Sequence, residues 1–232
     1  MISFVVPAYN EEKYLAATLA SIHAAAKAVG EPYEIIVADD ASTDATARIA
    51  RDGGATVVTV ANRQISKTRN SGAHASSGER LIFIDADTTV DAAVVRAACD
   101  AMDAGAVGGG APVQFPPDAA PRWLHAAMKL VVPLFRLAKW AAGCFVFCTR
   151  AAFEKAGGFP EEHFAGEEIW FSQALKRHGR FVVVGPAVTT SARKTEGRSM
   201  WDLAWMMIKL FVRSPLGVKK REHADFWYDG KR

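Results

Sequence analysis

A short apolar run of the sequence ends in two aspartates. Residues 81–84 are all apolar and predict a strand buried on both faces. Asp85 and Asp87 follow with only Ala86 between them, so both carboxylates lie on the same side of an extended chain. Two unpaired charges at the end of a buried strand carry a large desolvation penalty, so we expect a cation beside them. Carboxylate oxygens are the ligands that Mg²⁺ and Mn²⁺ prefer, and the pair therefore predicts a divalent metal site.

A second acidic pair, Asp39 and Asp40, ends the predicted strand 33–38. In an open α/β sheet, ligands bind outside the carboxyl ends of the strands. One pair could hold a metal while the other accepts hydrogen bonds from a nucleobase or from sugar hydroxyls. The alternative is a strand, a turn and a helix from about residue 91, capped by Asp87 or Thr88. Two acidic pairs at one sheet edge favour the ligand site over this alternative.

The elements that must position these carboxylates alternate between strand and helix. The predicted strands are 2–6, 33–38, 56–60 and 81–84, and the predicted helices are 11–29, 44–52 and 65–76. This order predicts an α/β fold with a mostly parallel central sheet flanked by helices. No Gly-rich phosphate loop follows the first strand, so the phosphates of a bound nucleotide would need a metal and basic side chains.

The second half of the chain is less regular. Its predicted helices are 91–103, 122–140, 150–156, 166–178 and 199–213, and its predicted strands are 107–112, 143–149 and 181–184. The helix over 199–213 is apolar on nearly every face and a basic tail follows it, which is typical of a buried helix or a membrane-interface helix. We therefore divide the chain into a domain over 1–198, with halves 1–90 and 91–198, and an apolar helical extension over 199–232.

Composition narrows the function further. The chain has 232 residues, half of them hydrophobic, and a formal net charge of +3, which is too small for a dedicated nucleic-acid binder. Three cysteines indicate a reducing compartment without a disulfide framework. The chain begins directly with a predicted strand and holds no uncharged apolar run long enough to span a bilayer. We therefore expect a cytoplasmic protein.

Several short motifs occur in a set order. They are Val6-Pro7-Ala8-Tyr9-Asn10-Glu11, Ala38-Asp39-Asp40-Ala41-Ser42-Thr43-Asp44, Arg69-Asn70-Ser71-Gly72, Asp85-Ala86-Asp87, Gly157-Gly158-Phe159 and Glu167-Glu168. Over about residues 2–185 this set resembles the family 2 glycosyltransferases of the GT-A fold. The resemblance implies sugar transfer from a nucleoside-diphosphate sugar to an acceptor hydroxyl, usually with inversion at the anomeric carbon and with a divalent metal, Mn²⁺ or Mg²⁺. It also implies a nucleotide-binding first half and an acceptor-binding second half.

The resemblance also assigns roles to residues. Asp85 and Asp87 match the metal motif, with Asp87 the better candidate for direct coordination. The family often has Glu-Asp where this chain has Glu167 and Glu168, so the general base is Glu168, with Glu167 as the alternative. The donor-binding set comprises Pro7, Ala8 and Tyr9 over the nucleobase, Asp40 and less certainly Asp39 on the base, Glu11 on the ribose, Arg69 near the base or phosphates, and the metal motif with Ala86.

Arg193 and Lys194 follow the last matched strand. They either close over the diphosphate as the leaving charge develops or form a solvated basic turn.

Two other functions compete with sugar transfer. A nucleotidyltransferase also uses carboxylates and a metal, but it usually needs a Gly-rich basic loop after the first strand. A non-catalytic nucleotide-binding protein would not need Asp85, Asp87 and Glu168.

The helices over 122–140 and 199–213 either pack on protein, for example across a homodimer, or contact the inner face of the membrane. Membrane contact would suit a lipid or lipid-linked acceptor.

Overall fold

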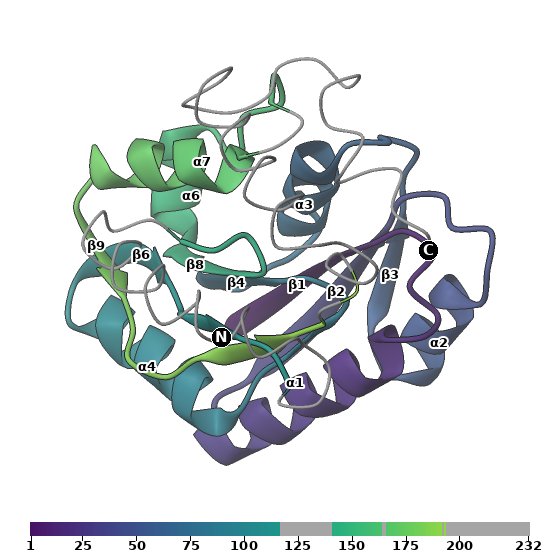
Figure 1. Cartoon of the computed structure of the whole chain (residues 1–232). Helices are drawn as coiled ribbons and strands as arrows, with labels where there is room; N and C mark the ends of the chain where they lie inside the picture. The colour runs from purple at the N-terminus through teal and green to yellow at the C-terminus, as the bar shows by residue number, and fades with distance from the viewer. Residues whose placement is uncertain (117–140, 164–165, 192, 194–232) are drawn as a thin grey trace, which may run out of the picture.

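The computed structural model describes residues 1–116, 141–163, 166–191 and 193 (Figure 1). The helices expected over 122–140 and 199–213, and the side chain of Lys194, lie outside the described residues. Among the described residues, no helix is both long enough and apolar enough to cross a bilayer.

A seven-stranded sheet with the order β3-β2-β1-β4-β8-β6-β9 forms the centre of the fold. Only β8 is antiparallel to its neighbours, β4 and β6, so the expected mostly parallel sheet is confirmed. The strands are β1 (Ile2–Ala8), β2 (Tyr33–Asp39), β3 (Thr56–Thr59), β4 (Arg80–Ile84), β6 (Ala106–Gly110), β8 (Phe145–Thr149) and β9 (Arg180–Val183).

Helices cover both faces of this sheet. The helices α1 (Leu15–Val29), α2 (Thr46–Asp52) and α4 (Ala92–Asp103) lie on one face, and α3 (Ile65–His74), α6 (Arg150–Ala156) and α7 (Glu167–Lys176) lie on the other (Figure 1). Neighbouring strand residues point to opposite faces, so Phe4 and Val6 join one hydrophobic core and Val5 joins the other. The central strands are therefore buried on both sides, as their uninterrupted apolar sequences predict.

A second, three-stranded sheet has the order β5-β10-β7, with β5 (Thr88–Thr89), β7 (Val113–Gln114) and β10 (Val188–Thr190). None of its strands was predicted as a separate element, because strands of two or three residues are too short to show a hydrophobic periodicity. Pairing of β10 with β5 brings the chain around residue 190 against the segment that follows Asp87.

The starts of helices α1 and α4 bear on the acidic motifs. Helix α1 begins at Leu15 rather than Glu11, and the carbonyl of Glu11 accepts hydrogen bonds from the N–H groups of Tyr14 and Leu15. Helix α4 is capped by Asp91, whose side chain accepts from the N–H of Val94 at 2.9 Å. Asp87 and Thr88 therefore do not cap this helix, and the alternative interpretation of Asp87 is wrong.

Candidate functional site

Acidic side chains from three adjacent strands gather at the carboxyl edge of the large sheet. Strand β1 leads to Glu11, β2 ends at Asp39, and β4 is followed by Asp85 and Asp87. Since β1 lies between β2 and β4 in a parallel arrangement, the strand ends are neighbours in space. The expected convergence of the acidic motifs on one edge is therefore present in the structure.

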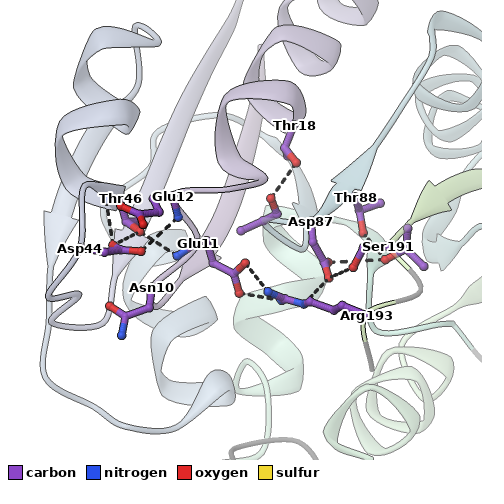
Figure 2. Close-up of polar contacts among 12 residues, drawn as sticks. Asn10, Glu11, Glu12, Thr18, Asp44, Thr46, Asp87, Thr88, Ser191 and Arg193 are labelled. Carbon is purple, nitrogen blue, oxygen red and sulfur yellow. Dashed lines mark hydrogen bonds and ion pairs between the residues drawn. The ribbon is translucent and has the colours of Figure 1, made fainter. Parts of the chain in front are cut away.

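Arg193 joins two of these carboxylates (Figure 2). Its Nη1 and Nη2 atoms donate to the two oxygens of Glu11, both at 2.7 Å, and its Nε lies 3.0 Å from Oδ2 of Asp87. The guanidinium also lies over the ring of Tyr14, 5.1 Å from its centroid. Burial lowers the pKa of Arg193, but the hydrogen bond to Glu11 and the charge of Asp87 outweigh it and raise that pKa above its usual value, so the side chain is charged.

The segment that carries the metal motif is held from two sides. On one side, the hydroxyl of Thr18 on α1 donates to the carbonyl of Ala86 at 2.7 Å. On the other side, the hydroxyl of Ser191 donates to Oδ2 of Asp87 at 2.6 Å and its N–H donates to the carbonyl of Asp87 (Figure 2). These contacts hold the backbone of residues 86 and 87 in place and so position the Asp87 carboxylate.

Arg69 binds a different set of acidic groups. Its side chain is 1% exposed, and its Nη2 donates to Oδ1 of Asp85 at 2.8 Å and to the carbonyl of Gly143 at 2.9 Å. Its Nη1 donates to Oε1 of Glu167 at 2.7 Å. Burial lowers the pKa of Arg69, but the carboxylates around it raise that pKa above the usual value, so this buried cation is charged. Asp85 and Asp87 thus contact different arginines rather than one shared cation.

The two glutamates open α7, as expected, and they differ in their surroundings. Glu167 is buried against Arg69. Glu168 lies beside Gly143: a Cβ atom built on this glycine would be 3.3 Å from the carboxyl carbon of Glu168. Burial, together with the negative charge of Glu167, raises the pKa of Glu168 to about 8. A carboxylate with a raised pKa accepts a proton more readily than an ordinary glutamate does.

Hydrogen bonds distinguish Asp40 from Asp39. The Oδ1 atom of Asp40 accepts from the N–H groups of Asn62 and Arg63 at 2.6 and 3.0 Å, and its Oδ2 accepts from the hydroxyl of Thr68 at 3.1 Å. Among the described residues, Asp39 accepts one side-chain hydrogen bond, from the N–H of Ser42 at 3.3 Å. The carboxylate of Asp40 is therefore used to hold the segment before α3.

The remaining donor-set residues lie on or just after β1. Pro7 and Ala8 are buried in the strand. The hydroxyl of Tyr9 accepts from Nη1 of Arg63 at 3.2 Å, and this guanidinium lies over the Tyr9 ring at 5.0 Å from its centroid. The motif Arg69-Asn70 also contacts the Gly-Gly-Phe motif, because the N–H of Phe159 donates to Oδ1 of Asn70 at 2.8 Å.

The carboxylates fit a metal that is shared with a substrate. Among the described residues, no group of three or more His, Cys, Asp or Glu side chains could hold a metal ion. Asp85 and Asp87 supply hard oxygen ligands, and Mg²⁺ is commonly bound by one or two carboxylates together with substrate phosphates and water. The donor set therefore suits Mn²⁺ or Mg²⁺ bound together with a diphosphate better than it suits a permanent metal centre.

The contact residues that the sequence did not single out include Tyr14, Thr18, Gly143 and Ser191. Each acts through a tertiary contact to a residue distant in the sequence. Of these four residues, only Ser191 could have been suspected from the sequence, because it lies two residues before Arg193.

Residues 3–158 match the family model of glycosyl transferase family 2. The undecaprenyl-phosphate 4-deoxy-4-formamido-L-arabinose transferase of Pseudomonas paraeruginosa (strain DSM 24068 / PA7) is 35% identical over 94 residues, which make up 38% of this chain and 28% of that protein. The 4,4'-diaponeurosporenoate glycosyltransferase of Staphylococcus aureus (strain USA300) is 37% identical over 94 residues, which make up 38% of this chain and 24% of that protein. The matched segment thus spans about a quarter of the length of each of these relatives.

Solved structures share the fold at lower sequence identity. The mannosyltransferase PcManGT of Pyrobaculum calidifontis, in complex with GDP-Man and Mn²⁺, has a TM-score of 0.69 and 19% identity, covering 98% of this chain and 68% of that chain. TarS of S. aureus in complex with UDP-GlcNAc has a TM-score of 0.65 and 20% identity, covering 97% of this chain and 69% of that chain. The expected GT-A fold is therefore confirmed. Because the family model covers more than half of the sequence, this chain belongs to glycosyl transferase family 2.

Proposed function

We propose that the protein transfers a sugar from a nucleoside-diphosphate sugar to an acceptor, with inversion at the anomeric carbon. The main support for this proposal is that two groups of acidic side chains lie near each other at one edge of the sheet. Asp87 lies beside Glu11 and Arg193 on one side, and Glu168 lies beside Arg69 and Gly143 on the other. A transferase of this kind needs one carboxylate group for the donor and one for the acceptor, and this arrangement supports assigning Asp87 to the donor and Glu168 to the acceptor.

Tyr9 and the end of β2 would bind the nucleobase. We assign the base contact to Asp39 rather than Asp40, because Asp40 already accepts three hydrogen bonds from the protein. An ionised Asp39 can accept from an N–H of the base. Glu11 lies on the same edge and would reach the ribose once Arg193 releases it.

Asp87 would bind the divalent metal directly, and Asp85 would contribute to the same site. When bound, the metal supplies Lewis-acid stabilisation of the charge that develops on the leaving diphosphate. Nε of Arg193 lies 3.0 Å from Oδ2 of Asp87. We expect a metal on Asp87 to displace this contact, and the charged guanidinium of Arg193 would then turn toward the diphosphate. The neighbouring Lys194 would add to this positive charge.

Glu168 would act as the general base. Its carboxylate would take the proton from the acceptor hydroxyl as the acceptor oxygen attacks the anomeric carbon from the side opposite the diphosphate. Glu167 is engaged with Arg69 through a charged hydrogen bond, so it is the weaker candidate for the base. Such general-base help is typically worth about 10²- to 10⁴-fold in rate.

The acceptor we propose is a lipid or a lipid-linked group. One matched relative is named as an undecaprenyl-phosphate 4-deoxy-4-formamido-L-arabinose transferase, and another is named as a 4,4'-diaponeurosporenoate glycosyltransferase. In this chain the apolar sequence over 199–213 and the basic residues after it would bring the protein to the inner face of the membrane. The first half of the domain would bind the donor and the second half the acceptor.

A thermal-shift screen of the common nucleotide sugars with Mn²⁺ tests this function. The expected result is stabilisation by at least one donor in the presence of Mn²⁺. Asp87→Ala should remove both this stabilisation and transfer; because it also removes the ion pair with Arg193 and the hydrogen bond from Ser191, circular dichroism is used to check that the variant remains folded. Full activity of Asp87→Ala would contradict the assignment.

A further inference from the structure

Arg69 has no surface left for a donor molecule. Its side chain is 1% exposed. One terminal nitrogen donates to Glu167, and the other donates to Asp85 and to the carbonyl of Gly143. One face of the guanidinium lies over the ring of Phe159, 5.2 Å from its centroid. A residue that binds a nucleobase or a phosphate must expose part of its guanidinium, and Arg69 does not.

The groups that Arg69 joins come from separate elements. Asp85 follows β4 and belongs to the proposed metal motif. Glu167 begins α7 and is the neighbour of the proposed base. Gly143 precedes β8, and the carbonyl of the next residue, Cys144, accepts from the N–H of Asp85 at 3.2 Å. One buried cation thus connects the donor-side and acceptor-side halves of the site through hydrogen bonds of 2.7 to 2.9 Å.

Gly143 also determines the space that Glu168 occupies. A Cβ atom at position 143 would lie 3.3 Å from Cδ and 3.5 Å from Oε1 of Glu168, and 3.6 Å from Nη2 of Arg69. Contacts of 3.3 Å are tighter than ordinary van der Waals contacts of carbon atoms, so the carboxylate would have to move by a few tenths of an ångström. The backbone of Gly143 is not in the left-handed region, so alanine introduces this displacement without backbone strain.

We propose that Arg69 and Gly143 are positioning residues for the transfer reaction: the buried Arg69 side chain holds Asp85 and Glu167 at a set separation, and Gly143 leaves the space in which the Glu168 carboxylate faces the acceptor. This inference rests on the function proposed above. It changes the role of Arg69 from a donor ligand, as the sequence resemblance implied, to a residue that acts through other residues.

Gly143→Ala is the direct test, and Gly185→Ala is its matched control. Gly185 lies between β9 and β10, and a Cβ atom there meets no atom within 4 Å. The affinity for UDP and for GDP with Mn²⁺ is measured by calorimetry, and kcat is measured with a donor that the wild-type protein uses. Misplacing a catalytic group by even 1 Å can lower the rate by about 10²-fold. For the few tenths of an ångström expected here we predict a loss in kcat of about 10-fold or more, with nucleotide affinity within about 3-fold of wild type.

Arg69→Lys completes the test, because it retains the buried charge but loses the planar fork of donors. The positioning role predicts that kcat falls by a larger factor than nucleotide affinity does, because Asp85 and Glu167 both lose their set position, whereas a donor-ligand role predicts that nucleotide affinity falls by the larger factor. The inference is overturned if Gly143→Ala behaves like Gly185→Ala, or if Arg69→Lys, while remaining folded by circular dichroism, loses nucleotide affinity by a larger factor than kcat. If wild-type protein binds no nucleotide with Mn²⁺ and turns over no donor, the proposed function itself fails, which is a separate result.

Discussion

Glu168 owes its chemistry to its surroundings rather than to its residue type. An ordinary glutamate has a pKa of 4.5, whereas burial and the charge of Glu167 raise that of Glu168 to about 8. The folded state therefore binds this proton more tightly than the unfolded state does. By linkage, ionising Glu168 lowers the free energy of unfolding as the pH rises from about 4.5 to about 8.

Glu168→Gln removes this titration. We expect the variant to gain stability over wild type as the pH is raised from 5 to about 8, and to differ little from wild type at pH 5, as measured by urea unfolding.

The Glu168→Gln substitution should also lower kcat by about 10²- to 10⁴-fold with donor affinity nearly unchanged. A large loss in Glu167→Gln and a small loss in Glu168→Gln would instead mean that the two roles are exchanged. Small losses in both would point to an acceptor that is already ionised, such as a phosphate.

Asp39 and Asp40 provide a second comparison between neighbours. Asp40→Asn places an amide nitrogen or a neutral oxygen opposite three donors, so we expect it to lower the free energy of unfolding by about 1–3 kcal/mol. Asp39→Asn should lower the affinity for nucleoside diphosphate while costing less stability. Urea unfolding and calorimetry on both variants measure the two effects. Loss of nucleotide affinity in Asp40→Asn with full stability would restore Asp40 as the base contact.

At the scale of elements, helix α1 supports the metal motif from behind. The buried hydroxyl of Thr18 donates to the carbonyl of Ala86, between the two aspartates of the motif. Thr18→Val retains the shape but leaves this carbonyl without its donor, which costs about 1–3 kcal/mol. We expect a lower affinity for nucleoside diphosphate with Mn²⁺, measured by calorimetry, while Thr18→Ser, which retains the hydroxyl, stays close to wild type. Equal affinities in Thr18→Val and wild type would show that this support is unimportant.

Helices and strands were predicted well where the hydrophobic periodicity and the Gly or Pro residues that end an element agree. The alternation of strand and helix up to β4 is present, and both acidic pairs end strands of one sheet edge. Helix α1 was predicted to start too early: it begins at Leu15, and the preceding turn is held by contacts such as the one from the backbone N–H of Glu11 to the hydroxyl of Thr46 at 2.7 Å, between residues 35 apart in the sequence. The strands β5, β7 and β10 were missed because each has only two or three residues and forms through pairing within the three-stranded sheet.

Side-chain partners were harder to predict than elements. The two aspartates after β4 indicated a nearby cation, but nothing in the local sequence shows that two different arginines, Arg69 and Arg193, would contact them. Gly143 has no sequence signal, because its importance comes from the glutamate packed against it. Such contacts depend on the arrangement of the sheet and its helices, which residue spacing alone does not determine.

For the whole molecule, the proposed lipid acceptor makes a prediction about location. The sequence of residues 199–213 is mostly apolar, and Lys219, Lys220 and Arg221 follow it. We expect the intact protein to float with liposomes that contain anionic lipid, and a protein truncated before Ser199 to float less, because apolar burial and basic charge both favour binding. If neither protein floats, and the intact protein is a dimer that truncation separates, this segment is a contact between subunits instead.

The central claim is that this chain uses a nucleotide sugar as donor with the help of a divalent metal. Its most direct test is the release of nucleoside diphosphate from a panel of nucleotide sugars with Mn²⁺, repeated with an excess of chelator. We expect the protein to release nucleoside diphosphate from at least one donor and to lose this activity in excess chelator. Release that is unchanged in excess chelator would contradict the metal role of Asp85 and Asp87. No release from any donor, together with no binding of any nucleoside diphosphate, would contradict the proposed transfer itself.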